Sequence, residues 1–154
     1  MSKFAALILT CALFLSACTG GSNGTSACGP TIRESLDPQS ALHVLNPGDV
    51  TYLTNPPTSG PHAVAGAIAG IQIEPLPAPI QVGILESGRV LIQYRDTIDQ
   101  VQELATDTVI VAPNASLGAP IVITAWLHKM ECTTVNIEEL ERFIGTNRNQ
   151  GPAH

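Results

Sequence analysis

The sequence predicts a single small α+β domain with a mainly antiparallel or mixed sheet and two helices packed on one face of it. Apolar, β-branched segments in the second half of the chain indicate buried strands, and helical spacing between and after them indicates the two helices. The long N-terminal half is rich in Pro and Gly and leaves room only for short elements. A chain of 154 residues is enough for one domain with its own core.

The N-terminus has the pattern of a bacterial lipoprotein signal peptide. Met1-Ser2-Lys3 is a positively charged start, and Phe4–Leu15 is an apolar stretch too short to cross a bilayer of about 30 Å as a permanent helix. Leu15-Ser16-Ala17-Cys18 then matches a cleavage and lipidation signal. The alternative is a buried core helix with a cysteine there by chance.

This interpretation divides the chain into three parts. We expect a lipoprotein signal peptide at residues 1–17, a lipidated Cys18 followed by a flexible linker up to residue 27, and one α+β domain over residues 28–154. The protein would then be a cell-envelope lipoprotein, facing the periplasm or the exterior. Thr19 stands where an aspartate is associated with inner-membrane retention, which favours the outer membrane in a host with two membranes.

The composition limits the partners of the protein. The net charge is −6, with only seven Lys and Arg residues, so we expect no binding to nucleic acid and no electrostatic adhesion to anionic lipid. Attachment to the membrane would depend on the lipid at Cys18. The remaining partner would be an unknown envelope protein or a small ligand.

Four cysteines are present, and two of them remain for the folded domain. Cys11 would leave with the signal peptide and Cys18 would carry the lipid, which leaves Cys28 and Cys132. In an oxidising compartment this pair predicts a disulfide, and the alternative is two free buried thiols. The bond would close a loop of about 105 residues and contribute about 4–5 kcal/mol in the chain-entropy model.

The first half of the domain offers few regular elements. Residues 46–82 are rich in Pro and Gly, and only short strands fit there, at Val50–Leu53 and Ile71–Ile73. Such a long stretch must be held by tertiary contacts, and long ordered loops often carry function.

The second half is more regular. Its three apolar segments predict buried strands at Arg89–Tyr94, Thr108–Ala112 and Pro120–Leu127. Between the first two, Thr97 with Gln100 resembles a capping box, and the helical spacing continues to Leu104.

The last predicted element is a helix that begins after Asn136. Asn136 with Glu139 is a second N-cap pair, and Gly145 is a suitable stop. The apolar face of this helix consists of Ile137, Leu140, Phe143 and Ile144.

The most suggestive histidine ends a proline-rich loop. Asn55-Pro56-Pro57-Thr58-Ser59-Gly60-Pro61-His62 has a tightly restricted backbone, so the loop presents the His62 side chain in a defined direction. A rigidly held imidazole suits a ligand or an acid–base site. The alternative is a simple turn in which His62 bonds a backbone group.

The chain resembles an uncharacterised bacterial family, domain of unknown function 3105. The resemblance covers nearly all of the domain in the right order, and the long proline motif and the closing RNQGP make it specific. The matching segments are His43-Val44, Tyr52–His62, Gly83–Tyr94, Ile123–Trp126, Cys132 and Arg148–Pro152.

The resemblance implies a metal site that this chain has only in part. The family pattern around Glu86 reads His-x-Leu-Glu-His-Gly, with histidines at the positions of Gly83 and Ser87. Both are absent here, and Ser87 is a poor ligand for soft or borderline metals. His154 stands near the place of a terminal carboxylate in the family.

We therefore expect a non-catalytic binding or structural module with no cofactor, a degenerate relative that kept the fold and lost a metal site. No metal ligands are assigned from the sequence, although His62 and His154 are candidates, and His62, Glu86 and His43 are the candidate ligand-binding residues. The first alternative is a copper- or zinc-binding protein using His62, Glu86 and another histidine such as His43. The second is a hydrolase with His62 and Glu86 as an acid–base pair.

Overall fold

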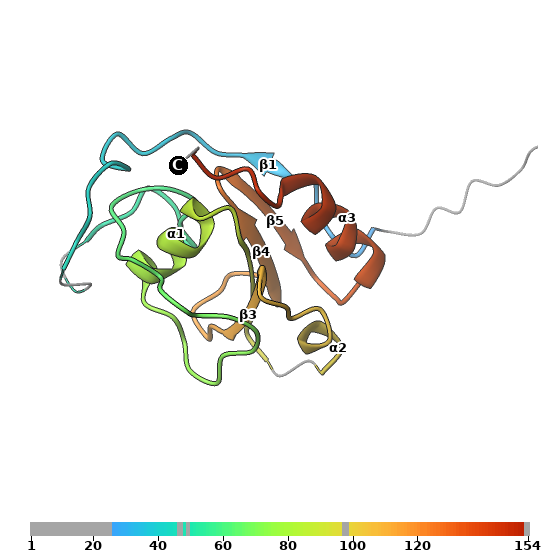
Figure 1. Cartoon of the computed structure of the whole chain (residues 1–154). Helices are drawn as coiled ribbons and strands as arrows, with labels where there is room; N and C mark the ends of the chain where they lie inside the picture. The colour runs from blue at the N-terminus through green and yellow to red at the C-terminus, as the bar shows by residue number, and fades with distance from the viewer. Residues whose placement is uncertain (1–25, 46–47, 49, 97–98, 153–154) are drawn as a thin grey trace, which may run out of the picture.

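One five-stranded mixed sheet forms the centre of the molecule (Figure 1). The computed structural model describes residues 26–45, 48, 50–96 and 99–152. In order along the chain, the elements are β1 (Ile32–Arg33), α1 (Ala78–Glu86), β2 (Val90–Tyr94), α2 (Asp99–Gln102), β3 (Val109–Pro113), β4 (Ile121–Ala125), β5 (His128–Cys132) and α3 (Ile137–Asn147). The strand order in space is β1-β5-β4-β2-β3. The α+β fold class is thus confirmed.

Several sequence predictions fall outside the described residues. These are the signal peptide, the lipidation at Cys18, the linker as far as residue 25, the N-cap at Thr97, and His154. Among the described residues, no helix combines the length and the apolar character needed to cross a membrane.

The pairing of the strands follows from their connections. β2 and β3 run parallel, because the chain crosses over between them through α2. β4 is antiparallel to both β2 and β5, and β1 is antiparallel to β5. The three strands predicted in the second half correspond to β2, β3 and β4.

β5 was not predicted, because its sequence HKMEC does not look like a buried strand. Lys129 and Met130 are nevertheless buried, and Met130 lies opposite Ile123 of β4. Lys129 is tolerated there because its ammonium group pairs with Glu34, 2.8 Å away. That partner comes from a distant part of the chain and is invisible to a local pattern.

The two expected helices, α2 and α3, pack on the same face of the sheet. Val101 of α2 and Leu140 and Phe143 of α3 share one core cluster with the alternate strand residues Ile92 and Ile123. The other face is covered by α1, as Figure 1 shows. The sheet is therefore buried on both sides.

The sequence does not predict α1 either. Residues Val50–Leu53 and Ile71–Ile73 are not strands, and Ile71 only bridges Val111. The proline-rich stretch instead leads into a helix, with Pro77 at its N-cap and Pro79 in its first turn, where proline removes no helical hydrogen bond. Because α1 is buried around most of its surface, it has no polar stripe and no clear helical period in the sequence.

α3 begins as predicted but ends later. The Asn136 side chain accepts a hydrogen bond from the Glu139 N–H and caps the helix. The Glu139 carboxylate does not complete the capping box and instead accepts hydrogen bonds from Ser26 and from the Cys28 N–H. The helix continues past Gly145 to Asn147, whose side chain donates to the Phe143 carbonyl.

A disulfide joins Cys28 to Cys132, as predicted. The two residues are 104 positions apart, so the bond ties the start of the domain to the end of β5. Both sulfurs lie in the core cluster that α3 covers.

Removing this bond should lower the free energy of unfolding by about 4 kcal/mol, because it closes a long loop in the unfolded chain. The measurement is urea unfolding of the oxidised protein and of a Cys28→Ser, Cys132→Ser double variant. The second comparison is the wild-type protein after a reductant has broken the disulfide. An unchanged urea midpoint in the double variant would show that the cross-link does not constrain the unfolded state.

Candidate functional site

Contacts with Tyr52 restrict the loop NPPTSGPH, residues 55–62, at its C-terminal end. The Tyr52 hydroxyl donates a hydrogen bond to the Pro61 carbonyl, 2.6 Å away. The Tyr52 ring also packs on Gly60, where a Cβ would lie 2.9 Å from the ring and where φ is +130°. Only glycine suits that backbone conformation and that close approach. Burial, with a smaller effect of the Asp37 carboxylate, raises the pKa of Tyr52 to about 12, so the hydroxyl stays a donor at neutral pH.

A partly buried charged group, Glu34, connects the loop to the sheet. Glu34 accepts hydrogen bonds from Thr58 at 2.6 Å and from Thr54 at 2.8 Å, and its other oxygen pairs with Lys129 of β5. Burial by itself would raise the pKa of Glu34, but the hydrogen bonds from Lys129, Thr58 and Thr54 hold that pKa below its ordinary value. Glu34 is therefore an anion at neutral pH and orients the loop.

His62 is held at the end of this loop and brings His43 beside it. The backbone N–H of His62 donates to the Leu42 carbonyl at 2.9 Å. The backbone N–H of Val44 donates to the His62 carbonyl at 2.8 Å. These bonds form a parallel bridge between His43 and His62. The two ring centroids are 4.5 Å apart in an edge-to-face arrangement.

Glu86, the last residue of α1, completes the cluster. Its Oε2 atom lies 2.7 Å from Nε2 of His62, whose side chain is 1% exposed, while that of Glu86 is 19% exposed. Nδ1 of His62 lies 3.1 Å from the Gly60 carbonyl. A carbonyl only accepts, so Nδ1 is the donor in this contact, and the ring then directs Nε2 toward Glu86.

Nε2 of His62 and Oε2 of Glu86 form a close polar contact, which is an ion pair when the ring is protonated, and Nε2 makes no hydrogen bond to any other residue that the structure describes. A buried ring nitrogen and a carboxylate therefore face each other at short range. Such an arrangement needs a cation between them, either a proton or a metal ion. Binding of a metal by Nε2, with Nδ1–H donated to a backbone carbonyl, is the usual geometry of a histidine ligand.

His43, His62 and Glu86 together form a group that could hold a metal ion. One ligand atom from each lies within 4.8 Å of the others. Nitrogen and oxygen ligands bind zinc at about 2.0–2.2 Å, so neighbouring ligands of one ion lie about 3–3.5 Å apart. The structure thus unites all three candidate ligand-binding residues.

Gly83 and Ser87, at whose positions the resemblance implies histidine, have other roles here. Gly83 lies on α1 directly against the backbone of the loop, where a Cβ would overlap the Ala63 carbonyl oxygen. The Ser87 hydroxyl donates to the Ile84 carbonyl and accepts a hydrogen bond from Arg89, each at 2.7 Å. Gly83 therefore allows α1 to approach His62, and Ser87 closes the end of α1.

The closing RNQGP motif also supports the site, which the sequence alone did not suggest. The Asn149 N–H donates to the Gly88 carbonyl at 2.7 Å. Gly151 packs so closely on the end of α1 that a Cβ there would overlap the Glu86 carbonyl oxygen. The motif thus fixes the turn that follows Glu86. The signal for this role is the pair of glycines, Gly88 and Gly151, each of which permits a close backbone approach.

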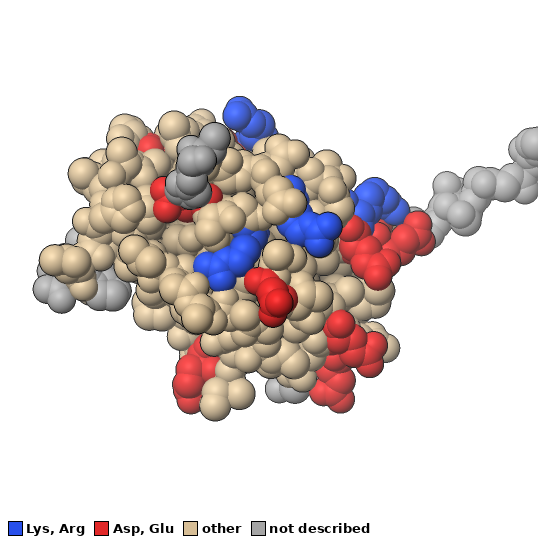
Figure 2. All heavy atoms as spheres, in the orientation of Figure 1, with Lys and Arg blue, Asp and Glu red and all other residues tan. Residues whose placement is uncertain are grey.

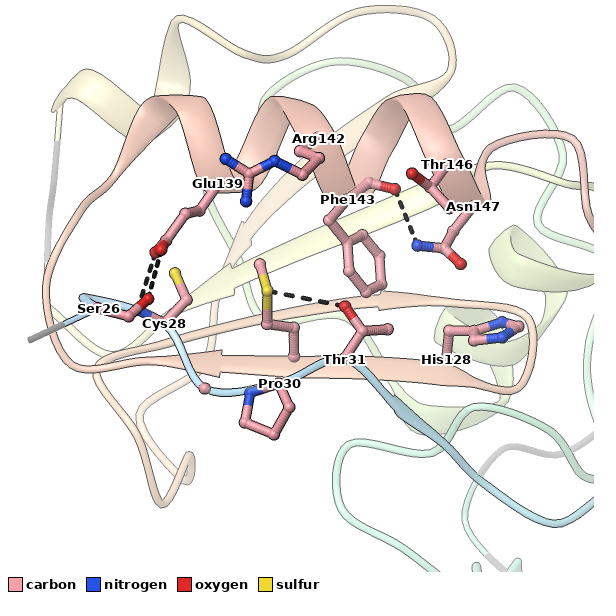
Figure 3. A pocket seen from close by; sticks show the side chains of 12 residues that line it. Ser26, Cys28, Pro30, Thr31, His128, Glu139, Arg142, Phe143, Thr146 and Asn147 are labelled. Carbon is pink, nitrogen blue, oxygen red and sulfur yellow. Dashed lines mark hydrogen bonds between the residues drawn. The ribbon is translucent and has the colours of Figure 1, made fainter. Parts of the chain in front are cut away.

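A cavity of about 690 Å³ lies away from this cluster, between the segment at Ser26–Thr31, β5 and α3. Figure 3 shows Phe143 pointing into it, with His128 at one end, and Met130 is among the residues that line it. Nδ1 of His128 contacts the Trp126 carbonyl at 2.8 Å, and Thr31 makes a weak contact with the Met130 sulfur. No residue of the His43, His62 and Glu86 cluster lines this cavity.

Comparison with known proteins assigns a family but no activity. The family model described as protein of unknown function (DUF3105) matches residues 38–154. No curated protein and no solved structure matches the chain significantly. The matched residues include the whole cluster and its supporting loop.

Substituting Gly83→Ala should push α1 away from Ala63 and lower the free energy of unfolding by about 1–3 kcal/mol, as overpacking does. Gly145→Ala on α3 is the matched control, since a Cβ there meets nothing within 4 Å and alanine should stabilise the helix by about 0.5–1 kcal/mol. Urea unfolding measures both. Equal stability of the two variants would show that the contact between α1 and the loop is not close.

Proposed function

Because the chain belongs to the DUF3105 family, whose function is unknown, we propose a function from the chemistry of its site. The protein is a lipid-anchored envelope protein that binds one transition-metal ion, zinc or copper, through His43, His62 and Glu86. It is a binding module and not an enzyme. The loss of family histidines at Gly83 and Ser87 favours a degenerate module without metal, but the three remaining groups converge and outweigh that argument.

The observation that carries the proposal is the buried Nε2 atom of His62. It faces the Glu86 carboxylate at 2.7 Å, while Nδ1 is bonded to the Gly60 carbonyl. A metal ion would satisfy the ring nitrogen and the carboxylate together. Imidazole nitrogen with one carboxylate suits zinc and copper(II), and a site with three protein ligands leaves one position open.

The hydrolase alternative has one supporting observation. His62 and Glu86 are close enough to act as an acid–base pair. Against it, the His62 side chain is 1% exposed, and its Nε2 atom faces Glu86. A general base must reach a proton of the substrate, so this burial favours metal binding over catalysis.

The envelope location supports the same function. The signal at Leu15–Cys18 would export the chain and anchor it by lipid, and an oxidising compartment agrees with the disulfide between Cys28 and Cys132. Outside the cytoplasm a metal site built from histidine and carboxylate has the advantage that it cannot oxidise to a disulfide.

The exported protein, purified without a chelating tag, should contain close to one zinc or copper ion per chain. His62→Ala should remove the bound metal, and Glu86→Gln should weaken binding at least about tenfold, because each change deletes a ligand. His128→Ala is the matched control, since His128 lies outside the cluster, and it should leave the metal content unchanged. Elemental analysis of the dialysed variants is the measurement, with circular dichroism to verify folding.

The metal-binding proposal would be wrong if the folded wild-type protein held no metal after incubation with zinc and with copper. Equal metal content in the His62→Ala and His128→Ala variants would also contradict it, because the ion would then lie elsewhere.

Cys18→Ser should abolish lipid attachment and lower retention in the membrane fraction, because a chain of net charge −6 gains no electrostatic attraction to anionic lipid. Mass spectrometry of the intact chain and cell fractionation measure the two effects. Cys11→Ser is the control and should be anchored normally. Membrane retention of an unlipidated Cys18→Ser protein would contradict the anchor.

A further inference from the structure

The surface around the candidate metal site has an unusual composition. From residue 38 to residue 73, Asp49 is the only charged residue. Within the described residues, the strongly exposed large apolar side chains all lie between Ile32 and Ile73. Figure 2 shows one view of this contrast: tan atoms cover most of the side formed by the loops and α1, while red and blue atoms gather toward α3. Large exposed apolar areas without charge are typical of docking surfaces.

Three of these apolar side chains flank the metal ligands. Leu42 and Leu45 are 51% and 98% exposed and stand one and two residues from His43. Val64 is 78% exposed and stands two residues after His62. We call Leu42, Leu45 and Val64 the apolar rim. The backbone bridge between His43 and His62 brings the two segments of the rim together.

We infer that the apolar rim is the contact surface for a second copy of this chain and that metal binding drives the association. This inference rests on the proposed metal site. Leu45 and Val64 of each copy would pack against the other copy around a two-fold axis, which is the usual symmetry of a homodimer.

The net charge of the chain favours a second copy as the partner that binds the apolar rim. A protein of net charge −6 repels its own copies over most approaches. α3 is an example, since it carries Glu138, Glu139 and Glu141 against the single Arg142. The nearly uncharged face around the rim is where two copies can meet without like-charge repulsion, and it is also where apolar area is available to bury.

The arrangement of the ligands makes the association depend on metal. His43 is exposed and belongs to the segment that carries Leu42 and Leu45, whereas His62 is buried in the rigid loop and Glu86 ends α1. Without metal, the bridge holds this segment to the loop through two backbone hydrogen bonds. A metal ion bound to all three side chains would cross-link the segment to the loop and to α1. The rim would then have a fixed shape, and less conformational entropy would be lost on docking.

The test is the molar mass of the exported chain carrying Cys18→Ser, measured by sedimentation over a wide range of protein concentration. We expect a monomer after chelation and a dimer with one zinc ion per chain. Leu45→Asp and Val64→Asp should bind zinc as the parent chain does but raise the dimer dissociation constant at least about tenfold, because each puts a charge into the apolar contact. Ile32→Asp is the matched control: Ile32 is 57% exposed but lies on β1, outside the rim, so dimerisation should be unchanged.

The possible results test the dimerisation inference separately from the proposed metal site. A zinc-loaded chain that stays monomeric at every concentration overturns the inference and leaves the metal site standing. A dimer that forms equally after chelation, or that tolerates both rim substitutions, also overturns it. A chain that binds neither zinc nor copper refutes the proposed function itself.

Discussion

The buried ion pair between Glu34 and Lys129 holds together the parts of the structure on which the site depends. The Glu34 carboxylate accepts hydrogen bonds from Thr54 and Thr58 of the proline-rich region, and the Lys129 ammonium group belongs to β5. Removing one partner of such a pair leaves an uncompensated buried charge, which costs about 3–5 kcal/mol. The pair therefore ties the N-terminal segment and the loop to the sheet and gives His62 a fixed position.

α1 supplies the second half of the site through close backbone packing. The Ala63 N–H donates to the Pro79 carbonyl, and Gly83 lets the helix touch the Ala63 carbonyl. Glu86 follows one turn after Gly83 and so reaches His62. At the C-terminal end of α1, the backbone of Gly151 packs closely against the Glu86 carbonyl. The helix is held between two backbone segments, and this confinement sets the 2.7 Å contact between Glu86 and His62.

Gly83 and Ser87 have structural roles in this arrangement. Gly83 does not leave a gap, because the loop backbone fills the place of its side chain. Ser87 uses its hydroxyl to close the helix. These positions serve packing, and the three ligand groups that remain come from three separate segments. The site that they form opens through His43 onto a nearly uncharged surface, whereas the His62 end is buried.

The features that depend on local pattern could be predicted from the sequence. The strands β2, β3 and β4, the N-cap of α3 at Asn136 and the pairing of Cys28 with Cys132 follow from apolar periodicity, capping chemistry and cysteine count. The stiffness of the loop that ends in His62 follows from its prolines and Gly60. Tertiary structure alone decided the rest. β5 contains a lysine that only the distant Glu34 makes tolerable, and α1 lacks a helical period because both sides of it are buried. The convergence of His43, His62 and Glu86 depends on a backbone bridge and a helix contact between segments far apart in the chain, and local sequence carries no signal for such contacts.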